Sequence, residues 1–153
     1  MASMTIPPFE RFYSDHAGEV FGYLAKVLGR GPAEDAFQET FLRALRGYPA
    51  LEHGRHLRAW VFTIATRVVL DSRRRPEPAL LDGEPATTDE RPAYAELEHL
   101  VDGLPPTERA AVVLRYGYDL SYEAIGDALG STEVAARQAA SSGVRRLRER
   151  STA

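Results

Sequence analysis

Apolar residues recur along this chain at spacings of three and four, which places them on one face of an α-helix. The pattern predicts helices over 9–28, over 32–47 and from about 56 to 75. Pro32 suits a first helical turn and Gly47 suits a helix end. Period-two runs of β-branched residues between turn signals, the mark of a strand, do not occur. The first part of the chain therefore predicts a small all-α domain.

The pattern stops over residues 76–92, "PEPALLDGEPATTDERP", which hold four prolines and five acidic residues. A Pro-rich, charged stretch without periodicity is typical of a linker. Fully extended, it would reach roughly 56–61 Å. A helix follows from about Tyr94 to Gly103, and the next helix lies in "LPPTERAAVVLRYGYDL", with Thr107 as its expected N-cap and Gly117 as its end. A second helical domain is therefore expected after the linker.

The last fifth of the chain has the order of a helix-turn-helix motif. "SYEAIGDALG" predicts a short helix capped by Ser121 and ended by Gly130, and Thr132 is the expected cap of the longer, basic helix that follows. Gly126 would allow these two helices to approach closely. The motif favours DNA binding.

Two sides are distinguishable on that last helix. Small or apolar residues form its expected buried stripe: Ala136, Ala140, Gly143 and Leu147. The other side offers long or small polar side chains: Arg137, Gln138, Ser141, Ser142 and Arg145, with Thr132 at the helix start. Arg and Gln read base edges in a major groove, and small neighbours leave room for them. An amphipathic helix with a solvated face is the alternative interpretation.

The stretch "AEDAFQETFLRA" also has two faces. Its expected core stripe is Phe37, Phe41, Ala44 and Leu45. On the opposite side an apolar residue is surrounded by polar ones: Leu42 among Asp35, Gln38 and Glu39. An apolar centre with a polar rim is how a protein interface looks. A single exposed leucine is also common, so the pattern alone leaves both interpretations open.

The distribution of charge along the chain is more informative than the net charge. The net charge is −3, but residues 1–75 carry 11 Lys/Arg against 8 Asp/Glu, and residues 131–150 carry 5 against 2. Residues 76–92 carry 1 against 5. Two basic patches, at 55–75 and 131–150, are thus separated by acidic sequence. Local patches attract phosphate even where the total does not.

Composition excludes several classes of protein. The absence of Cys rules out disulfides and thiolate metal sites, and the four His lack a paired ligand spacing, so we expect no metal and no cofactor. No secretory signal or membrane-spanning stretch is expected, which favours a cytoplasmic protein. Gly-rich phosphate loops, nucleophile elbows and paired-His motifs do not occur, so we expect no enzyme.

Three stretches taken in order resemble the extracytoplasmic-function (ECF) group of bacterial sigma factors, small members of the sigma-70 family. "AEDAFQETFLRA" resembles their region 2.2, and "LRAWVFTIATRVVLDSRRR" resembles regions 2.3 and 2.4. "LPPTERAAVVLRYGYDLSYEAIGDALGSTEVAARQAASSGVRRLRE" resembles region 4. The resemblance implies an all-α fold of two small helical domains, a region 2-like domain over 1–75 and a region 4-like helix-turn-helix domain over 93–153, joined by a flexible acidic linker over 76–92.

The resemblance also implies a function and its partners. The chain would direct RNA polymerase core to specific promoters and assist initiation, with the core (β′ and β subunits) and promoter DNA as partners. An anti-sigma factor is a further candidate partner. The acidic linker would thread the polymerase cleft. A stand-alone helix-turn-helix regulator is the alternative function; it would leave the face at 33–46 and the basic cluster at 55–75 without a role.

Site residues follow from the same resemblance. The polymerase-binding face, docking on the β′ coiled coil, would be Asp35, Gln38, Glu39 and Leu42. The minus-ten element would be contacted by Arg58, Trp60, Thr63, Thr66, Arg67, Arg73, Arg74 and Arg75. The minus-35 element would be read by Thr132, Arg137, Gln138, Ser141, Ser142 and Arg145. Trp60 would stack on a base or serve as a buried structural residue, and the three consecutive arginines would hold phosphates or favour a helix C-terminus.

Overall fold

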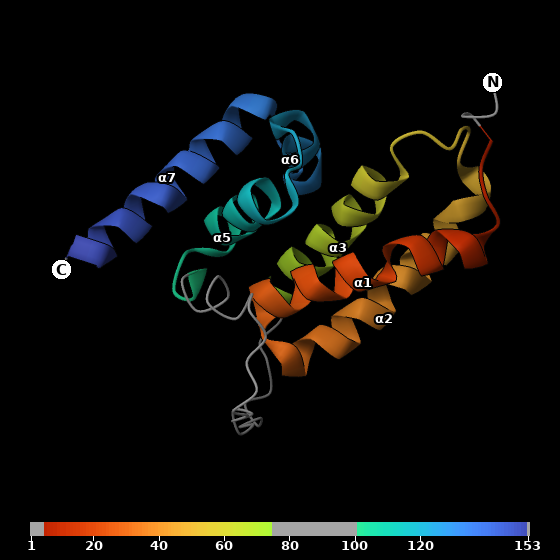
Figure 1. Ribbon diagram of the computed structural model, residues 1–153, viewed down its shortest axis with the longest axis horizontal. Helices are drawn as coiled ribbons and strands as arrows, with labels where there is room; N and C mark the ends of the chain where they lie inside the picture. The colour runs from red at the N-terminus through yellow and green to blue at the C-terminus, as the bar shows by residue number, and fades with distance from the viewer. Residues whose placement is uncertain (1–4, 75–100, 153) are drawn as a thin grey trace.

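A computed structural model of the chain describes residues 5–74 and 101–152 (Figure 1). The first part contains α1 (Phe9–Leu28), α2 (Arg30–Gly47), the 3-10 turn η2 (Tyr48–Ala50) and α3 (Leu57–Arg74). The second part contains α5 (Pro106–Val112), the π-helical turn η3 (Val113–Gly117), α6 (Tyr122–Leu129) and α7 (Glu133–Thr152). No strand occurs in these two described parts, which confirms the all-α prediction. The predicted linker and most of the helix expected from about 94 lie outside the described residues.

The first three helices pack pairwise into a bundle around an aromatic core. Phe12 of α1 is completely buried, with its ring centroid 6.0 Å from that of Phe41 and 5.7 Å from that of Trp60. The η2 turn contributes Tyr48, 5.2 Å from Phe12. Helix α1 begins and ends where its apolar pattern predicts, and α3 is within a residue of its predicted bounds. Side chains from four consecutive elements thus fix the mutual positions of α1, α2 and α3.

Helix α2 departs from its prediction in two ways. It begins at Arg30, directly after Gly29, whose φ of 89° ends α1 in a conformation that favours glycine. The prediction that Leu45 belongs to the core stripe is wrong, because its side chain is 50% exposed. It lies one residue after the fully buried Ala44, which rotates it by about 100° around the helix. The buried residues of α2 are Ala33, Ala36, Thr40, Phe41 and Ala44.

Helix α5 begins earlier than expected. Its N-cap is Pro105 and its first residue is Pro106, so the prediction of Thr107 as the N-cap is wrong. The carbonyl of Pro105 already accepts a hydrogen bond from the Arg109 amide at 2.8 Å, which places Thr107 inside the first turn. A proline at the first helical position is well suited because its nitrogen has no hydrogen to satisfy. The predicted end at Gly117 is confirmed as the last residue of η3.

The turn between α6 and α7 has the predicted local chemistry. Ser121 and Thr132 each cap a helix, their side-chain oxygens accepting from the amide three residues on at 3.1 and 3.0 Å. Gly130 ends α6 in the left-handed conformation, with φ 71°. A Cβ atom on Gly126 would lie 2.7 Å from the Thr132 carbonyl carbon, so only glycine allows this close approach. The helix-turn-helix geometry is therefore specified locally.

The two halves of the structure lie against each other. Figure 1 shows α5 and α6 beside α3, with α7 on their far side, and α3 contacts both α5 and α6. Buried apolar side chains from both halves form one continuous cluster. The sequence predicted two domains on a tether and gave no indication of this contact.

Candidate functional site

The second face of α2 is open to solvent as its pattern suggests. Asp35 and Gln38 are exposed, and Leu42 is 46% exposed. Leu45, displaced from the predicted core stripe, adds a second half-exposed leucine three residues further on. Residues three apart on a helix are neighbours, so the two leucines form an apolar centre next to the polar Asp35 and Gln38. This surface, here called the α2 face, has the composition of a protein interface.

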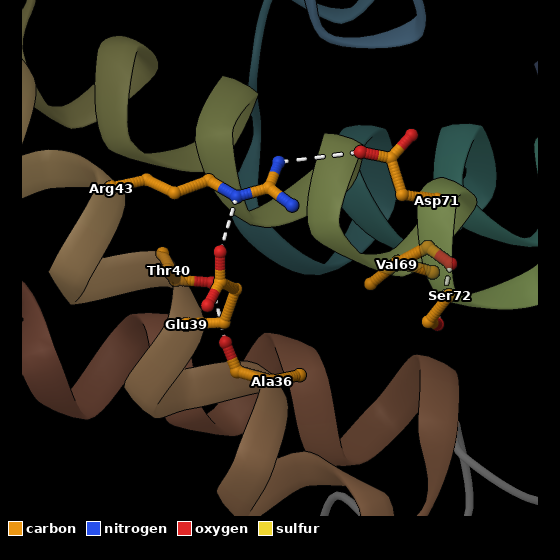
Figure 2. Close-up of polar contacts among 7 residues, drawn as sticks. All are labelled: Ala36, Glu39, Thr40, Arg43, Val69, Asp71 and Ser72. Atoms are coloured by element: carbon orange, nitrogen blue, oxygen red, sulfur yellow. Dashed lines mark hydrogen bonds and ion pairs between the residues drawn. The ribbon is translucent and has the colours of Figure 1, made fainter.

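Glu39, the remaining predicted member of the α2 face, is engaged within the molecule (Figure 2). Its Oε2 accepts from Arg43 Nε at 2.8 Å, and Arg43 Nη1 donates to Asp71 Oδ2 of α3 at 3.3 Å. The hydrogen bonds that Arg43 donates to Glu39 and to Asp71 raise its pKa above the ordinary value. Glu39 therefore lies at the edge of the α2 face and also helps to join α2 to α3.

The predicted minus-ten residues of α3 separate into exposed and buried ones. Arg67 is exposed, whereas Arg58 and Thr63 are half-buried. The Arg58 guanidinium donates to both carboxylate oxygens of Glu19, at 2.8 and 3.2 Å, and this hydrogen bonding lowers the pKa of Glu19. Arg58 and Arg67 also donate to backbone carbonyls in the second half of the chain. Arg58 thus reaches the segment after η3, and Arg67 reaches α6.

Thr66 is not part of the accessible surface of α3. It is completely buried, and its hydroxyl is hydrogen-bonded to the Tyr23 hydroxyl at 2.8 Å, so the prediction of a DNA contact there is corrected. Thr66 lies one residue before the exposed Arg67, which is enough to turn its side chain into the core. Trp60 is half-buried in the aromatic core with Phe12 and Tyr48, which favours the structural interpretation of this residue.

The three consecutive arginines, Arg73, Arg74 and Arg75, lie at the end of the first described part of the chain. Helix α3 ends at Arg74, so Arg73 and Arg74 belong to its last turn, where positive charge interacts favourably with the helix dipole. Their side chains, and all of Arg75, lie outside what the structure describes. The prediction of phosphate contacts at these three residues stays a prediction.

The side of α7 away from its neighbours is accessible along its length. Ala136 and Ala140 are completely buried against α5 and α6, and a Cβ on Gly143 would lie 2.6 Å from Val112 Cγ2. The predicted minus-35 residues are exposed or half-buried: Thr132, Arg137, Gln138, Ser141, Ser142 and Arg145. Thr132 additionally caps the helix. Arg137, Gln138, Ser141, Ser142 and Arg145 therefore lie away from the buried stripe of α7, and Thr132 lies at the helix start.

The sequence analysis missed a stacked arrangement that joins η3, α6 and α7. The guanidinium carbons of Arg115 and Arg137 lie 4.4 and 4.6 Å from the ring centroid of Tyr122. Arg137 also forms an ion pair with Glu133, at 3.1 Å. Arg115 is anchored by a hydrogen bond to the Leu120 carbonyl at 3.1 Å. Tyr122 therefore positions the first predicted base-reading side chain; the only sequence signal was an aromatic residue in the first turn of the shorter helix.

Other kinds of site find no support in the described parts of the chain. Among residues 5–74 and 101–152, no three His, Asp or Glu side chains gather in a way that would hold a metal ion. Within the same residues, no helix combines the length and apolar content that crossing a membrane requires. A packed helix-turn-helix whose second helix, α7, carries accessible polar side chains is instead typical of DNA-binding proteins of the helix-turn-helix class.

Comparison with known proteins narrows this class. Residues 12–77 match the family described as sigma-70 region 2, and residues 100–149 match the family described as sigma-70 region 4. RNA polymerase sigma factor CarQ of Myxococcus xanthus is 34% identical, over 92% of this chain and 87% of CarQ. ECF RNA polymerase sigma factor SigE of Mycolicibacterium smegmatis is 33% identical over 82% of this chain, which spans about half of SigE (54%).

The fold agrees with these matches. The sigma factor RpoE of Bartonella quintana, solved in complex with the anti-sigma factor NepR, superposes with a TM-score of 0.68, covering 92% of this chain and 94% of that one, at 20% identity. The chain belongs to the sigma-70 family, in its ECF group, and is a transcription initiation factor that directs RNA polymerase core to promoters. The match of residues 12–77 to region 2 also removes the alternative of a stand-alone helix-turn-helix regulator.

Proposed function

We propose that this sigma factor uses three separate surfaces on two domains, residues 1–75 and 93–153, to join core polymerase to promoter DNA. One observation carries the proposal. Helix α7 buries Ala136 and Ala140 completely and leaves Arg137 and Gln138 exposed on its other side. A helix of this kind, second in a helix-turn-helix, is suited to enter a major groove and read base edges.

The α2 face is the proposed contact with the polymerase core. Support comes from the half-exposed Leu42 and Leu45 beside the exposed Asp35 and Gln38. Glu39 contributes at the edge, where it already holds Arg43. An apolar centre gives affinity by burial, and its charged rim selects the partner.

The proposed minus-ten surface consists of the accessible polar side chains of α3, which are Arg58, Thr63 and Arg67, continued by the arginines at 73–75. Arginine at such positions holds phosphates or stacks on unpaired bases. Trp60, which is half-buried, lies in the same helix, so its accessible part could also contact DNA. Contact with DNA at Arg58 and Arg67 requires that the second half of the chain leave the place it occupies in Figure 1.

Partners and location complete the proposal. An anti-sigma factor is a proposed partner of this chain, testable by co-purification from the native cell. The proposed location is the cytoplasm, where core polymerase acts. Catalysis of RNA synthesis is assigned to the polymerase, whereas the chain supplies promoter recognition and assists initiation.

Site-specific photo-crosslinking tests the three assignments together. A benzophenone amino acid replaces Leu42, Thr63 or Ser141 in turn, and the holoenzyme is irradiated on a promoter labelled at either element. We expect Leu42 to crosslink to β′, Thr63 to minus-ten DNA and Ser141 to minus-35 DNA. The same probe at the exposed Glu10 of α1 is the matched control and should crosslink to none of them. A DNA crosslink from Leu42, or a β′ crosslink from Ser141, would overturn the corresponding assignment.

A further inference from the structure

One apolar side chain on the accessible side of α7 is not packed into the core of the protein. Val134, in the first turn of this helix, is 63% exposed, more than any other large apolar residue in the described parts of the chain. The other apolar residues of α7 are all buried or half-buried. Valine is also a poorer helix former than alanine, so helix propensity does not explain its presence there. The side chain is therefore available to a partner outside the chain.

Helix geometry places Val134 among the predicted minus-35 residues, although the sequence analysis did not include it. Successive residues of an α-helix are about 100° apart, so Val134 lies about 200° from the fully buried Ala136, nearly on the opposite side of the helix. The exposed Gln138 and Ser141 lie within about 40° of Val134 around the helix axis. Val134 thus begins the row that continues with these two residues. In a helix-turn-helix, the N-terminal residues of the second helix are the ones that contact base edges.

The surroundings of Val134 are those of a DNA-binding surface. Arg137 lies to one side, where its guanidinium carbon is 4.6 Å from the centroid of the Tyr122 ring and its Nη2 pairs with Glu133 at 3.1 Å. Glu133 is the one acidic residue between 133 and 143, and this ion pair offsets its charge. A protein interface has an apolar centre of several residues. A single apolar side chain among polar and basic ones fits instead a major groove, where the methyl group of thymine is the apolar feature.

The shape of valine and its distance from Gln138 define the contact further. Valine has one strongly preferred side-chain rotamer in a helix, so ordering it against a base costs little conformational entropy. Cβ atoms four residues apart on a helix are roughly 5–6 Å apart. Successive base pairs are separated by about 3.4 Å along the DNA axis. A side chain at Val134 therefore reaches one or two base pairs beyond the base that Gln138 contacts.

We propose that Val134 is a specificity-determining residue of this sigma factor, whose side chain contacts the 5-methyl group of a thymine in the minus-35 element. This thymine lies one or two base pairs from the base that Gln138 contacts. The inference rests on the proposed function of α7 as the reader of the minus-35 duplex. It adds a contact that recognises a methyl group, next to contacts that recognise hydrogen-bonding edges.

Deoxyuridine tests this contact without altering base pairing, because it differs from thymidine only in lacking the 5-methyl group. Each thymine in the minus-35 element of a promoter recognised by the holoenzyme is replaced in turn. Binding of holoenzyme to the duplex promoter fragment is then measured by competition with unmodified DNA. The proteins compared are the wild type, Val134→Ala and Val134→Thr, each assembled with core polymerase. Thymines between the two promoter elements are replaced in the same way as the control.

For the wild type we expect deoxyuridine at one minus-35 position to weaken binding by about fourfold, as for the loss of one buried methyl group. Val134→Ala should bind the unmodified promoter more weakly by a similar factor and should lose nothing further when deoxyuridine is placed there. Val134→Thr keeps one of the two methyl groups and should retain part of the sensitivity. Alanine is the better helix former, so Val134→Ala should keep its fold, which circular dichroism and thermal melts check.

Equal sensitivity of the wild type and Val134→Ala to every substitution would overturn the inference, as would a wild type that no minus-35 deoxyuridine weakens. A sensitive thymine more than two base pairs from the position at which Gln138→Ala relaxes preference would overturn the proposed placement. Gln138→Ala and Arg137→Ala in the same assay separate the inference from the proposed function. If they relax minus-35 preference while Val134→Ala leaves the response to the methyl group unchanged, only the inference fails. If they too leave minus-35 preference unchanged, the assignment of α7 as the reader fails as well.

Discussion

Leu42→Asp should abolish tight binding to core polymerase while leaving the fold nearly unchanged. The wild-type side chain is 46% exposed, so docking can bury about half of a leucine, worth roughly 0.7–1.5 kcal/mol. A carboxylate left without a partner in the centre of an interface costs several kcal/mol more. The sum, roughly 3–5 kcal/mol, corresponds to a binding constant weakened by roughly 150- to 4,000-fold. Folding should lose only about 0.5–1 kcal/mol, as is usual for an accessible helical position.

This substitution is a sharper probe than charge reversal at Glu39. Glu39→Lys would also break the bond to Arg43 and weaken the connection to Asp71, so binding and stability would change together. The assay is titration of a dye-labelled sigma factor with core polymerase, followed by anisotropy, with thermal melts of each variant. Val134→Asp, at a position 63% exposed on α7, introduces the same charge away from the α2 face. The reasoning is refuted if Leu42→Asp binds core within threefold of the wild type or no more weakly than Val134→Asp.

Three further outcomes are expected. Arg137→Ala and Gln138→Ala should each relax preference at particular minus-35 positions by ~1–3 kcal/mol, with minus-ten preference unchanged; unaltered minus-35 preferences in a selection from randomised promoters would place recognition elsewhere. Gly126→Val would place a Cβ atom 2.7 Å from the Thr132 carbonyl carbon, just before α7, so the melting temperature of the second half should fall by several degrees. An unshifted calorimetric transition would refute the close packing. The hydrogen bond from Arg58 lowers the pKa of Glu19 below its ordinary value of 4.5, so this carboxylate stabilises the fold above pH 4.5 and the stabilisation is lost as the pH falls through the lowered pKa. The difference in melting temperature between wild type and Glu19→Gln should therefore be present at pH 6 and shrink as the pH falls below 4.5, and a constant difference would exclude the pair.

Local chemistry explains which parts of the fold were predictable. Ser121, Gly130 and Thr132 determine helix ends through bonds to residues three or four positions away, and a sequence displays such residues directly. The prediction failed at Thr107 because two prolines before it start the helix earlier. It failed at Leu45 because the buried stripe of α2, which includes Thr40, Phe41 and Ala44, does not extend around the helix as far as Leu45. The error at Thr107 is thus one of local chemistry, whereas the error at Leu45 lies where packing decides.

The candidate site was predictable to the extent that it lies on single helices. Leu42 and Gln138 are exposed as their helical positions suggested. Thr66 was misassigned because a threonine on an amphipathic helix gives no sign of whether a distant Tyr23 will bond to it. Tyr118 was not recognised at all, since its partners lie in the other half of the sequence and no periodicity encodes them. Contacts between distant segments thus account for what the sequence did not reveal.

Run-off transcription with purified core polymerase tests the central claim most directly. Promoters are first located by mapping the 5′ ends of transcripts that appear when the chain is expressed. Core plus the chain should then produce a single-start transcript from such a promoter, abolished by changing either promoter element and by Leu42→Asp. Core alone, or a promoter from outside this set, should yield none. A chain that binds the promoter by itself but never confers promoter-specific initiation on core would contradict the account.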